Sequence, residues 1–157
     1  MTTKPKTLLE TSALQVEVEI PIKAPRDKVW KALIEDIGQW WHKDFYATQN
    51  HQRFVIEPKL GGRMYEDCGN ETGLIWATVY GIDPPNSLYL AGHFRPPWGG
   101  PATTLYVITL ERTEDNQTIL RLSDAVFGRV TENTADELDS GWRTLFEGLR
   151  DFVEKSS

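Results

Sequence analysis

Two side chains have the chemical type and the sequence position for acid–base work. His93 ends the apolar stretch "LYLAGHF", and histidine is the usual proton shuttle because its pKa lies near neutrality. Asp124 lies in "RLSDAVF", in alternation with Leu120, Leu122 and Val126. This spacing predicts that its carboxylate faces inward with the apolar residues. A buried carboxylate must find a partner or change its pKa.

The partner of Asp124 decides which chemistry would follow. Arg95 and Arg121 are candidates that would neutralise the carboxylate. A pair with His93 or with Tyr80 would instead be the kernel of a cyclase or isomerase site. Alternatively, Asp124 lies at a strand end or bonds locally, without a catalytic role. Enzyme activity therefore stays open, and a protein without it is favoured.

A cluster of aromatic residues is the second feature that could form a site. In "EDIGQWWHKDFY", Trp40, Trp41, Phe45 and Tyr46 follow the first predicted helix closely. One interpretation is ordinary core lining. The other is a flap whose aromatic rings roof the mouth of a cavity, with one of the two tryptophans in the core because adjacent residues rarely both face inward.

Further aromatic residues raise the same two interpretations. Trp76 and Tyr80 are predicted to share one strand face. Binding pockets are mostly apolar with a few convergent polar groups, and Tyr and Trp supply both kinds of surface, although a plain aromatic core would use the same residues. The residues predicted to line a cavity are Trp40, Trp41, Tyr65, Trp76, Tyr80, His93, Tyr106, Asp124, Trp142, Leu145 and Phe146.

Other kinds of site find no support in the sequence. His42 and His51 have no zinc spacing, and no serine lies in a G-x-S-x-G context. The glycine pair before Arg63 is too short for a phosphate-binding loop. Cys68, the single cysteine, lies in "EDCGNE", whose acidic residues disfavour a reactive thiolate. We expect neither a metal nor a cofactor.

Composition narrows the function further. The chain has 157 residues and a formal charge of −6, which argues against a nucleic-acid partner because phosphate binding draws on Lys and Arg. No apolar run approaches the length that spans a bilayer, and "MTTKPKTLLETSA" lacks the apolar core of a secretory signal. A single domain over residues 1–157, with a frayed N-terminus over about 1–12, and a cytoplasmic location are expected.

The elements that position these residues follow from periodicity. "LQVEVEIPIK" alternates as a strand with one buried face. A helix is predicted from Pro25, ending near Gly38, and about six strands between residues 52 and 127. A long amphipathic helix over about 134–155 follows, with Thr134 and Glu137 matching a capping box. The order favours an α+β fold with an antiparallel sheet covered by the last helix.

Two glycines interrupt that last helix. Gly141 and Gly148 each cost roughly 1 kcal/mol of helix propensity relative to alanine. They either leave room for a ligand under the helix or let the helix lie close to the sheet. Both interpretations remain open on the sequence.

Several phrases, in their order, resemble the helix-grip fold of the START/Bet v 1-like (SRPBCC) superfamily. They are "IPIKAPRDKVWKAL", "GGRMYE", "VYGIDPPNSLYL", "TILRLSDAVFG" and "DSGWRTLFEGLRDFVE". The nearest likeness is to the group related to the C-terminal domain of the activator of Hsp90 ATPase. The resemblance implies a curved antiparallel sheet of about six or seven strands gripping a long C-terminal helix, often with a cavity between them.

Three functions are consistent with this likeness. The favoured one is binding of a small apolar or aromatic molecule in the cavity. The alternatives are a co-chaperone-like protein with Hsp90 as its partner and a polyketide cyclase-like enzyme. The chain is expected to be a monomer or a homodimer.

Overall fold

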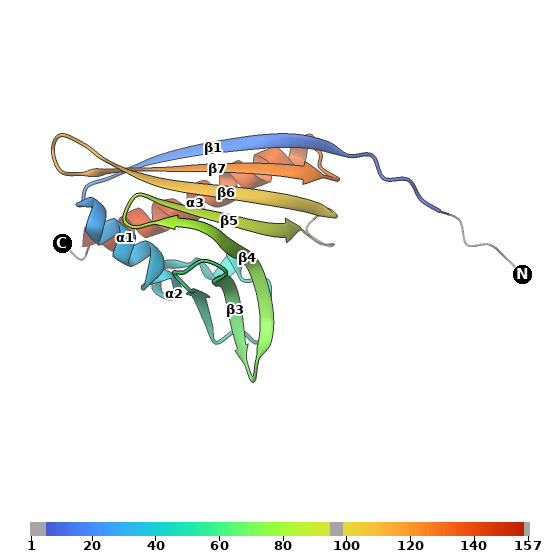
Figure 1. The fold of residues 1–157 in the computed structure, drawn as a ribbon, viewed down its shortest axis with the longest axis horizontal. Coiled ribbons are helices and arrows are strands. Elements are labelled where there is room, and N and C mark those ends of the chain that lie inside the picture. Colours follow the sequence, from blue (N-terminus) through green and yellow to red (C-terminus); the bar gives the residue numbers. More distant parts are fainter. Residues whose placement is uncertain (1–5, 95–98, 156–157) are drawn as a thin grey trace, which may run out of the picture.

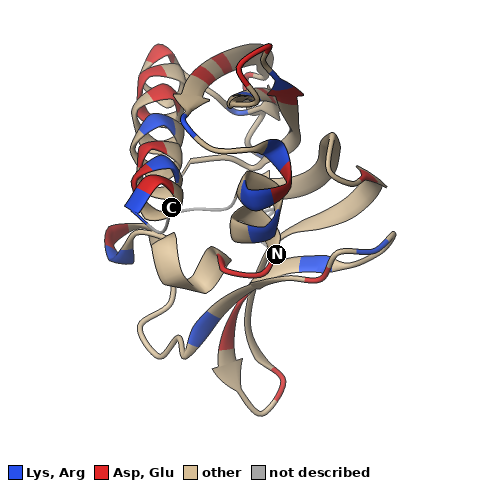
Figure 2. Cartoon of the chain, turned by 90° about the vertical axis from the view of Figure 1, so that its left-hand side faces the viewer, with Lys and Arg blue, Asp and Glu red and all other residues tan. Residues whose placement is uncertain are grey.

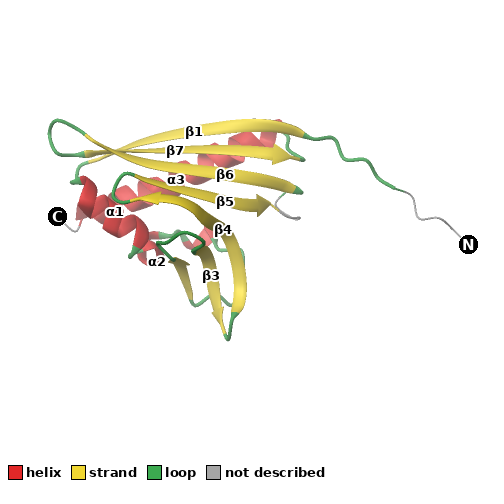
Figure 3. Ribbon diagram, in the orientation of Figure 1, coloured by secondary structure: helices red, strands yellow, loops and turns green. Residues whose placement is uncertain are grey.

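A seven-stranded antiparallel sheet forms most of the protein. The computed structural model describes residues 6–94 and 99–155, and its strands are arranged in the order β1-β7-β6-β5-β4-β3-β2, as Figures 1 and 3 show. Sequential strands are neighbours except that β1 pairs with β7. The strands are β1 (Ser12–Ile22), β2 (Arg53–Ile56), β3 (Arg63–Gly69), β4 (Thr72–Asp83), β5 (Ser87–Phe94), β6 (Ala102–Arg112) and β7 (Thr118–Gly128).

Strict alternation explains which face of the sheet is buried. In β1, Val16, Val18, Ile20 and Ile22 are buried while the residues between them are exposed. The same period of two continues in β6 and β7. The sheet curves strongly at β4 (Figure 1), where two register shifts interrupt the β3–β4 pairing, because a bulge bends its strand and increases the local twist.

The first helical region differs from the prediction of one continuous helix. It is divided into α1 (Arg26–Ile34), α2 (Ile37–Trp40) and a short 3-10 turn, η1 (Lys43–Phe45). Asp36 leaves the helical conformation, with φ −102° and ψ 15°. Gly38 therefore lies inside α2 and does not end α1. A Cβ built there would lie 3.2 Å from the Phe54 carbonyl oxygen, so the glycine permits close approach of α2 to β2.

The last helix, α3 (Glu132–Lys155), begins two residues before the predicted start. Its cap also differs from the predicted pair of Thr134 and Glu137. The Thr131 backbone N–H donates to the Thr134 hydroxyl at 3.1 Å, and the Thr134 N–H is 3.4 Å from the Thr131 hydroxyl. Thr131 is thus the capping residue. Acidic and basic residues recur along α3 (Figure 2), and each of them is at least partly exposed.

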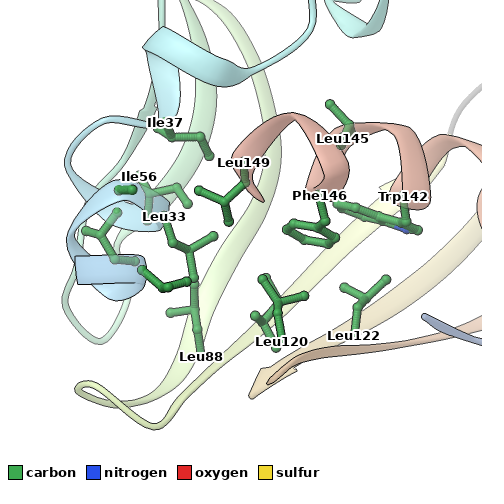
Figure 4. Close-up of a cluster of buried hydrophobic side chains, with 14 of the residues drawn as sticks. Leu33, Ile37, Ile56, Leu88, Leu120, Leu122, Trp142, Leu145, Phe146 and Leu149 are labelled. Carbon is green, nitrogen blue, oxygen red and sulfur yellow. The ribbon is translucent and has the colours of Figure 1, made fainter. Parts of the chain in front are cut away.

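α3 covers the concave face of the sheet, as the helix-grip fold requires. Trp142 and Phe146 point from α3 toward Leu120 and Leu122 of β7, and Leu149 lies near α1 and α2 (Figure 4). All five side chains are at most 5% exposed. The predicted α+β helix-grip architecture is confirmed. Among the described residues, no helix is long and apolar enough to cross a membrane.

Candidate functional site

A pocket of about 360 Å³ lies beside the N-terminal half of α3. Three parts of the chain form its wall: α3, the segment around η1, and strands β4 to β6. The wall is mainly aromatic and aliphatic, with a few polar groups. The lining residues are Asp44, Phe45, Tyr46, Ala47, Leu74, Ile75, Trp76, His93, Phe94, Tyr106, Thr134, Glu137, Leu138, Gly141, Trp142 and Leu145.

The helical side of the pocket follows from the periodicity of α3. Leu138, Gly141, Trp142 and Leu145 lie three or four residues apart and therefore share one face. Trp142 and Leu145, both in the set predicted from the sequence, line this pocket. Phe146 does not: it stacks on Trp142, with ring centroids 5.5 Å apart, and belongs to the filled core.

The glycines of α3 face the segment that precedes β2. A Cβ built at Gly141 would lie 3.2 Å from Cε1 of Phe45, whereas one at Gly148 would lie 3.5 Å from the carbonyl oxygen of Trp40. The first contact is tight and the second is ordinary van der Waals contact. The sequence left two explanations for these glycines, room for a ligand or close packing of the helix. The first agrees with the position of Gly141 at the pocket, and the second with the position of Gly148 against Trp40.

The aromatic flap differs from the prediction in its residues. Phe45 and Tyr46 line the pocket, but Trp40 and Trp41 do not, and they are only 6% and 5% exposed. The expectation that only one of the pair is in the core is wrong. α2 ends at Trp40 and Trp41 has an extended conformation, so the chain turns between them and both rings point inward. Trp41 stacks on Phe54 at 4.0 Å.

A bulge explains the positions of the strand aromatics. Met64 pairs with Ala77 and Tyr65 with Ile75, so Trp76 is left unpaired between them. This extra residue breaks the alternation, and Trp76 lines the pocket while Tyr80 faces solvent at 49% exposure.

Tyr65 and Tyr80 were both predicted to line a cavity, and both predictions are wrong. The guanidinium of Arg63 lies over the ring of Tyr65, with its Cζ 4.5 Å from the ring centroid. The ring centroids of Tyr80 and Tyr89 are 5.9 Å apart. Alternation places Tyr65 on the side of β3 opposite to the buried Met64.

Asp124 is fully buried and faces inward, but its partners differ from those predicted. Its Oδ1 accepts a hydrogen bond from the Thr104 hydroxyl, and its Oδ2 accepts one from the indole Nε1 of Trp142 at 2.8 Å. Burial raises the pKa of Asp124, and these two hydrogen bonds oppose that rise. Asp124 lies behind the wall of the pocket and not in it.

The predicted acid–base pair is therefore not formed. His93 is exposed and contributes to the pocket rim from the end of β5, whereas both oxygens of Asp124 are already engaged. Arg121 pairs with Glu19 and Glu111, and Arg95 lies outside the described residues.

Tyr106 is the most deeply buried polar group of the pocket wall. It is 2% exposed, and its ring lies 5.0 Å from that of Trp142. Burial, followed by the charge of Asp124, raises the pKa of Tyr106 well above its usual value. Its hydroxyl is hydrogen-bonded to the Thr104 side chain, so the ring is the part of Tyr106 that can face a ligand.

Sequence reasoning missed a second buried carboxylate, Glu66 in β3. It accepts hydrogen bonds from the backbone N–H groups of Ala47 and Thr48 at 2.7 and 2.9 Å. It also accepts from the Thr48 hydroxyl and from the Trp76 indole, both at 2.7 Å. The signal was its alternation with the apolar Met64 in "GGRMYE", the same pattern that identified Asp124. No group of three or more potential metal ligands occurs within the described ranges.

Comparison with solved structures supports the fold. A putative uncharacterized protein from Rhizobium leguminosarum is 18% identical with a TM-score of 0.71, over 95% of this chain and 99% of its own. CalU16 from Micromonospora echinospora is 20% identical with a TM-score of 0.60, over 92% and 86%. Ara h 8.0201 is 13% identical with a TM-score of 0.66, over 92% and 99%. At such identities the likeness concerns the fold alone.

Comparison of the sequence with models of protein families identifies the family of this chain. A comparison with curated proteins gives no match. The model of one protein family, described as Activator of Hsp90 ATPase homolog 1-like protein, matches residues 23–154. This range holds α1, α2, η1, all of α3 but its last residue, and all strands except β1. The chain therefore belongs to the Activator of Hsp90 ATPase homolog 1-like family.

Proposed function

We propose that the protein binds a small apolar or aromatic molecule in the pocket beside α3. The observation that carries the proposal is the pocket itself, about 360 Å³ in volume and walled by aromatic rings from three parts of the chain. Ligand pockets typically measure roughly 300–1,000 Å³ and combine an apolar wall with few polar groups. The volume favours a ligand of up to about three aromatic rings over a large lipid.

The hydrogen bonds of the wall favour an apolar ligand. The indole donors of Trp76 and Trp142 are both engaged by buried carboxylates, at 2.7 and 2.8 Å. These two side chains therefore offer their ring surfaces to a ligand and leave no free donor that would require a partner. The polar groups at the rim supply what polar recognition remains.

The neutral aromatic probe N-phenyl-1-naphthylamine tests the proposal by fluorescence titration and thermal unfolding. Binding should raise the unfolding free energy by about 2.7 kcal/mol at a hundredfold excess over Kd. Leu138→Trp, at the centre of the α3 lining, should fill the pocket and weaken binding about tenfold or more.

Leu60→Trp is the matched control. Leu60 is 72% exposed and does not line this pocket, so the same change there should leave the affinity unaltered. Equal affinities of the Leu138→Trp variant and the wild type would contradict the proposal.

The family name also refers to a protein, Hsp90. An Hsp90 partner stays a prediction, as do the cytoplasmic location and the monomeric or homodimeric state. An ATPase assay with Hsp90 separates the two functions, because surface-mediated stimulation should survive Leu138→Trp whereas ligand binding should not. A cyclase-like activity would need an arrangement other than His93 paired with Asp124, since Asp124 is engaged by Thr104 and Trp142.

A further inference from the structure

Glu66 has an unusual number of partners for a carboxylate without solvent exposure. It is 0% exposed, and transfer of a carboxylate from water into the interior costs several kcal/mol unless hydrogen bonds compensate it. Four donors surround it: two backbone N–H groups, one hydroxyl and one indole. Each oxygen accepts two of these bonds, so its hydrogen-bonding capacity is nearly filled.

These donors come from two separate walls of the pocket. Ala47 follows η1 and lines the pocket on one side, and Trp76 lines it from the bulge of β4. Thr48, the next residue after Ala47, contributes both its N–H and its hydroxyl. Glu66 itself lies on β3 and is not a lining residue. Its carboxylate thus joins the irregular segment to the sheet from behind.

The segment around Ala47 has other contacts, but most of them are longer. Within the segment, Tyr46 stacks on His51 at 3.7 Å between ring centroids, and the His51 ring bonds to the Thr48 carbonyl at 2.9 Å. Toward the sheet, Tyr46 lies edge-on to Phe54 of β2 with ring centroids 5.9 Å apart, and the Cys68 thiol lies 3.4 Å from the Thr48 hydroxyl. Next to the start of β2, the Gln52 N–H donates to the Asp67 carbonyl at 2.7 Å. The bonds to Glu66 differ from all of these in being charge-assisted, which is the stronger kind.

We propose that Glu66 is a positioning residue that clasps residues 46–48 to the sheet and fixes the orientation of the Trp76 indole, so that it controls how readily the pocket opens. The clasp does not depend on a ligand. Its effect on ligand exchange rests on the proposed function.

Glu66→Gln changes this arrangement with little change in shape. A carboxamide has one acceptor oxygen, so its NH2 group would face two of the four donors. Hydrogen bonds to a charged group are stronger than those between neutral groups, and we therefore expect local opening to become about tenfold or more frequent.

Amide exchange followed by NMR measures this directly. In Glu66→Gln, the amides of Ala47 and Thr48 and the indole N–H of Trp76 should exchange about tenfold or more faster than in the wild type. The amide of Leu122, in the core of the sheet, should keep its protection. Asp67→Asn is the control, because Asp67 follows Glu66 directly but binds Arg53 and the Gly69 N–H.

A second variant keeps the test decisive if Glu66→Gln does not fold. Thr48→Val removes one donor and retains the carboxylate, and the Ala47 and Thr48 amides should then exchange faster while Leu122 does not. Unchanged exchange at these amides, or a loss of protection that Leu122 shares equally, would overturn the clasp in either variant.

Stopped-flow binding of N-phenyl-1-naphthylamine separates the clasp from the proposed function. If both hold, Glu66→Gln should raise the association and dissociation rates together, with a smaller change in Kd. If the wild type binds no probe while the amide result stands, the ligand proposal fails and the clasp survives. If the probe binds but both rates equal those of the wild type, control of pocket opening by Glu66 is refuted.

Discussion

Two buried carboxylates each accept a hydrogen bond from a tryptophan of the pocket wall. Glu66 binds the indole of Trp76, and Asp124 binds that of Trp142. A tryptophan buried without an acceptor would lose a hydrogen bond that water supplies in the unfolded chain. The carboxylates therefore stabilise the aromatic wall in one orientation, from positions behind it.

Asp124→Asn tests this role at a single residue. The asparagine has one acceptor oxygen in place of two, so the Thr104 hydroxyl must reorient while the Trp142 indole keeps a partner. We expect the unfolding free energy to fall by about 1–2 kcal/mol at neutral pH, measured by urea denaturation. An unchanged midpoint and slope would show that the carboxylate contributes nothing to stability.

The same variant gives a prediction about pH. Burial raises the folded-state pKa of Asp124, so the folded state holds this proton more tightly than the unfolded state does. The wild-type unfolding free energy therefore falls as the pH rises from the ordinary aspartate value, about 3.9, through the raised value. The asparagine of the variant cannot titrate. The unfolding free energy of the variant should therefore lie furthest below that of the wild type at the low end of this pH window. The difference should shrink as the pH rises.

Urea denaturation of both proteins at a series of pH values measures that difference. Glu57 and Asp67 have lowered pKa values, Glu57 because of hydrogen bonds from Arg63 and Asp67 because of the Gly69 N–H and Arg53. They are present in both proteins, so their contributions cancel in the comparison. A deficit that stays constant or grows with pH would contradict the assigned direction.

At the scale of the element, α3 has two different environments along its length. Its N-terminal half borders the pocket through Leu138 and Gly141, whereas its C-terminal half, with Phe146, Leu149 and Val153, is packed in the core. One helix thus closes the sheet at one end and leaves space at the other. The two glycines mark this difference.

Alanine substitutions at these glycines should have different outcomes. At Gly148 the new Cβ makes ordinary contact, so Gly148→Ala should raise the unfolding free energy by about 1 kcal/mol through helix propensity. At Gly141 the new Cβ crowds Phe45. Gly141→Ala should therefore raise the unfolding free energy by less than Gly148→Ala does, and it should weaken binding of N-phenyl-1-naphthylamine. Thermal unfolding and probe titration of both variants check this, and equal effects on both quantities would contradict it.

At the scale of the whole molecule, regular periodicity made most of the architecture predictable. The alternation in β1, β6 and β7 and the apolar stripe of α3 were sufficient to predict an antiparallel sheet covered by a long helix, because each pattern persists over at least 11 residues. The resemblance to a known family added the helix-grip topology. Trp142 and Leu145 were placed at the pocket by the same helical period. The inward direction of Asp124 also followed from alternation.

Irregular geometry set the limit of prediction. The bulge that separates Trp76 from Tyr80 depends on pairing with β3, which no local pattern encodes. The turn that buries both Trp40 and Trp41 depends on the break after α1. Long-range partners were likewise inaccessible: neither Thr104 nor Trp142, which hold Asp124, is among the partners that the sequence suggested for it.

The central claim is that a small aromatic molecule occupies the pocket beside α3. A titration of 15N-labelled protein with N-phenyl-1-naphthylamine, followed through the tryptophan indole N–H signals, tests it most directly. The indoles of Trp76 and Trp142 line the pocket and should shift together and saturably, whereas that of Trp30, on α1, should not move. Absence of any shift at Trp76 and Trp142, or shifts confined to Trp30, would contradict the account.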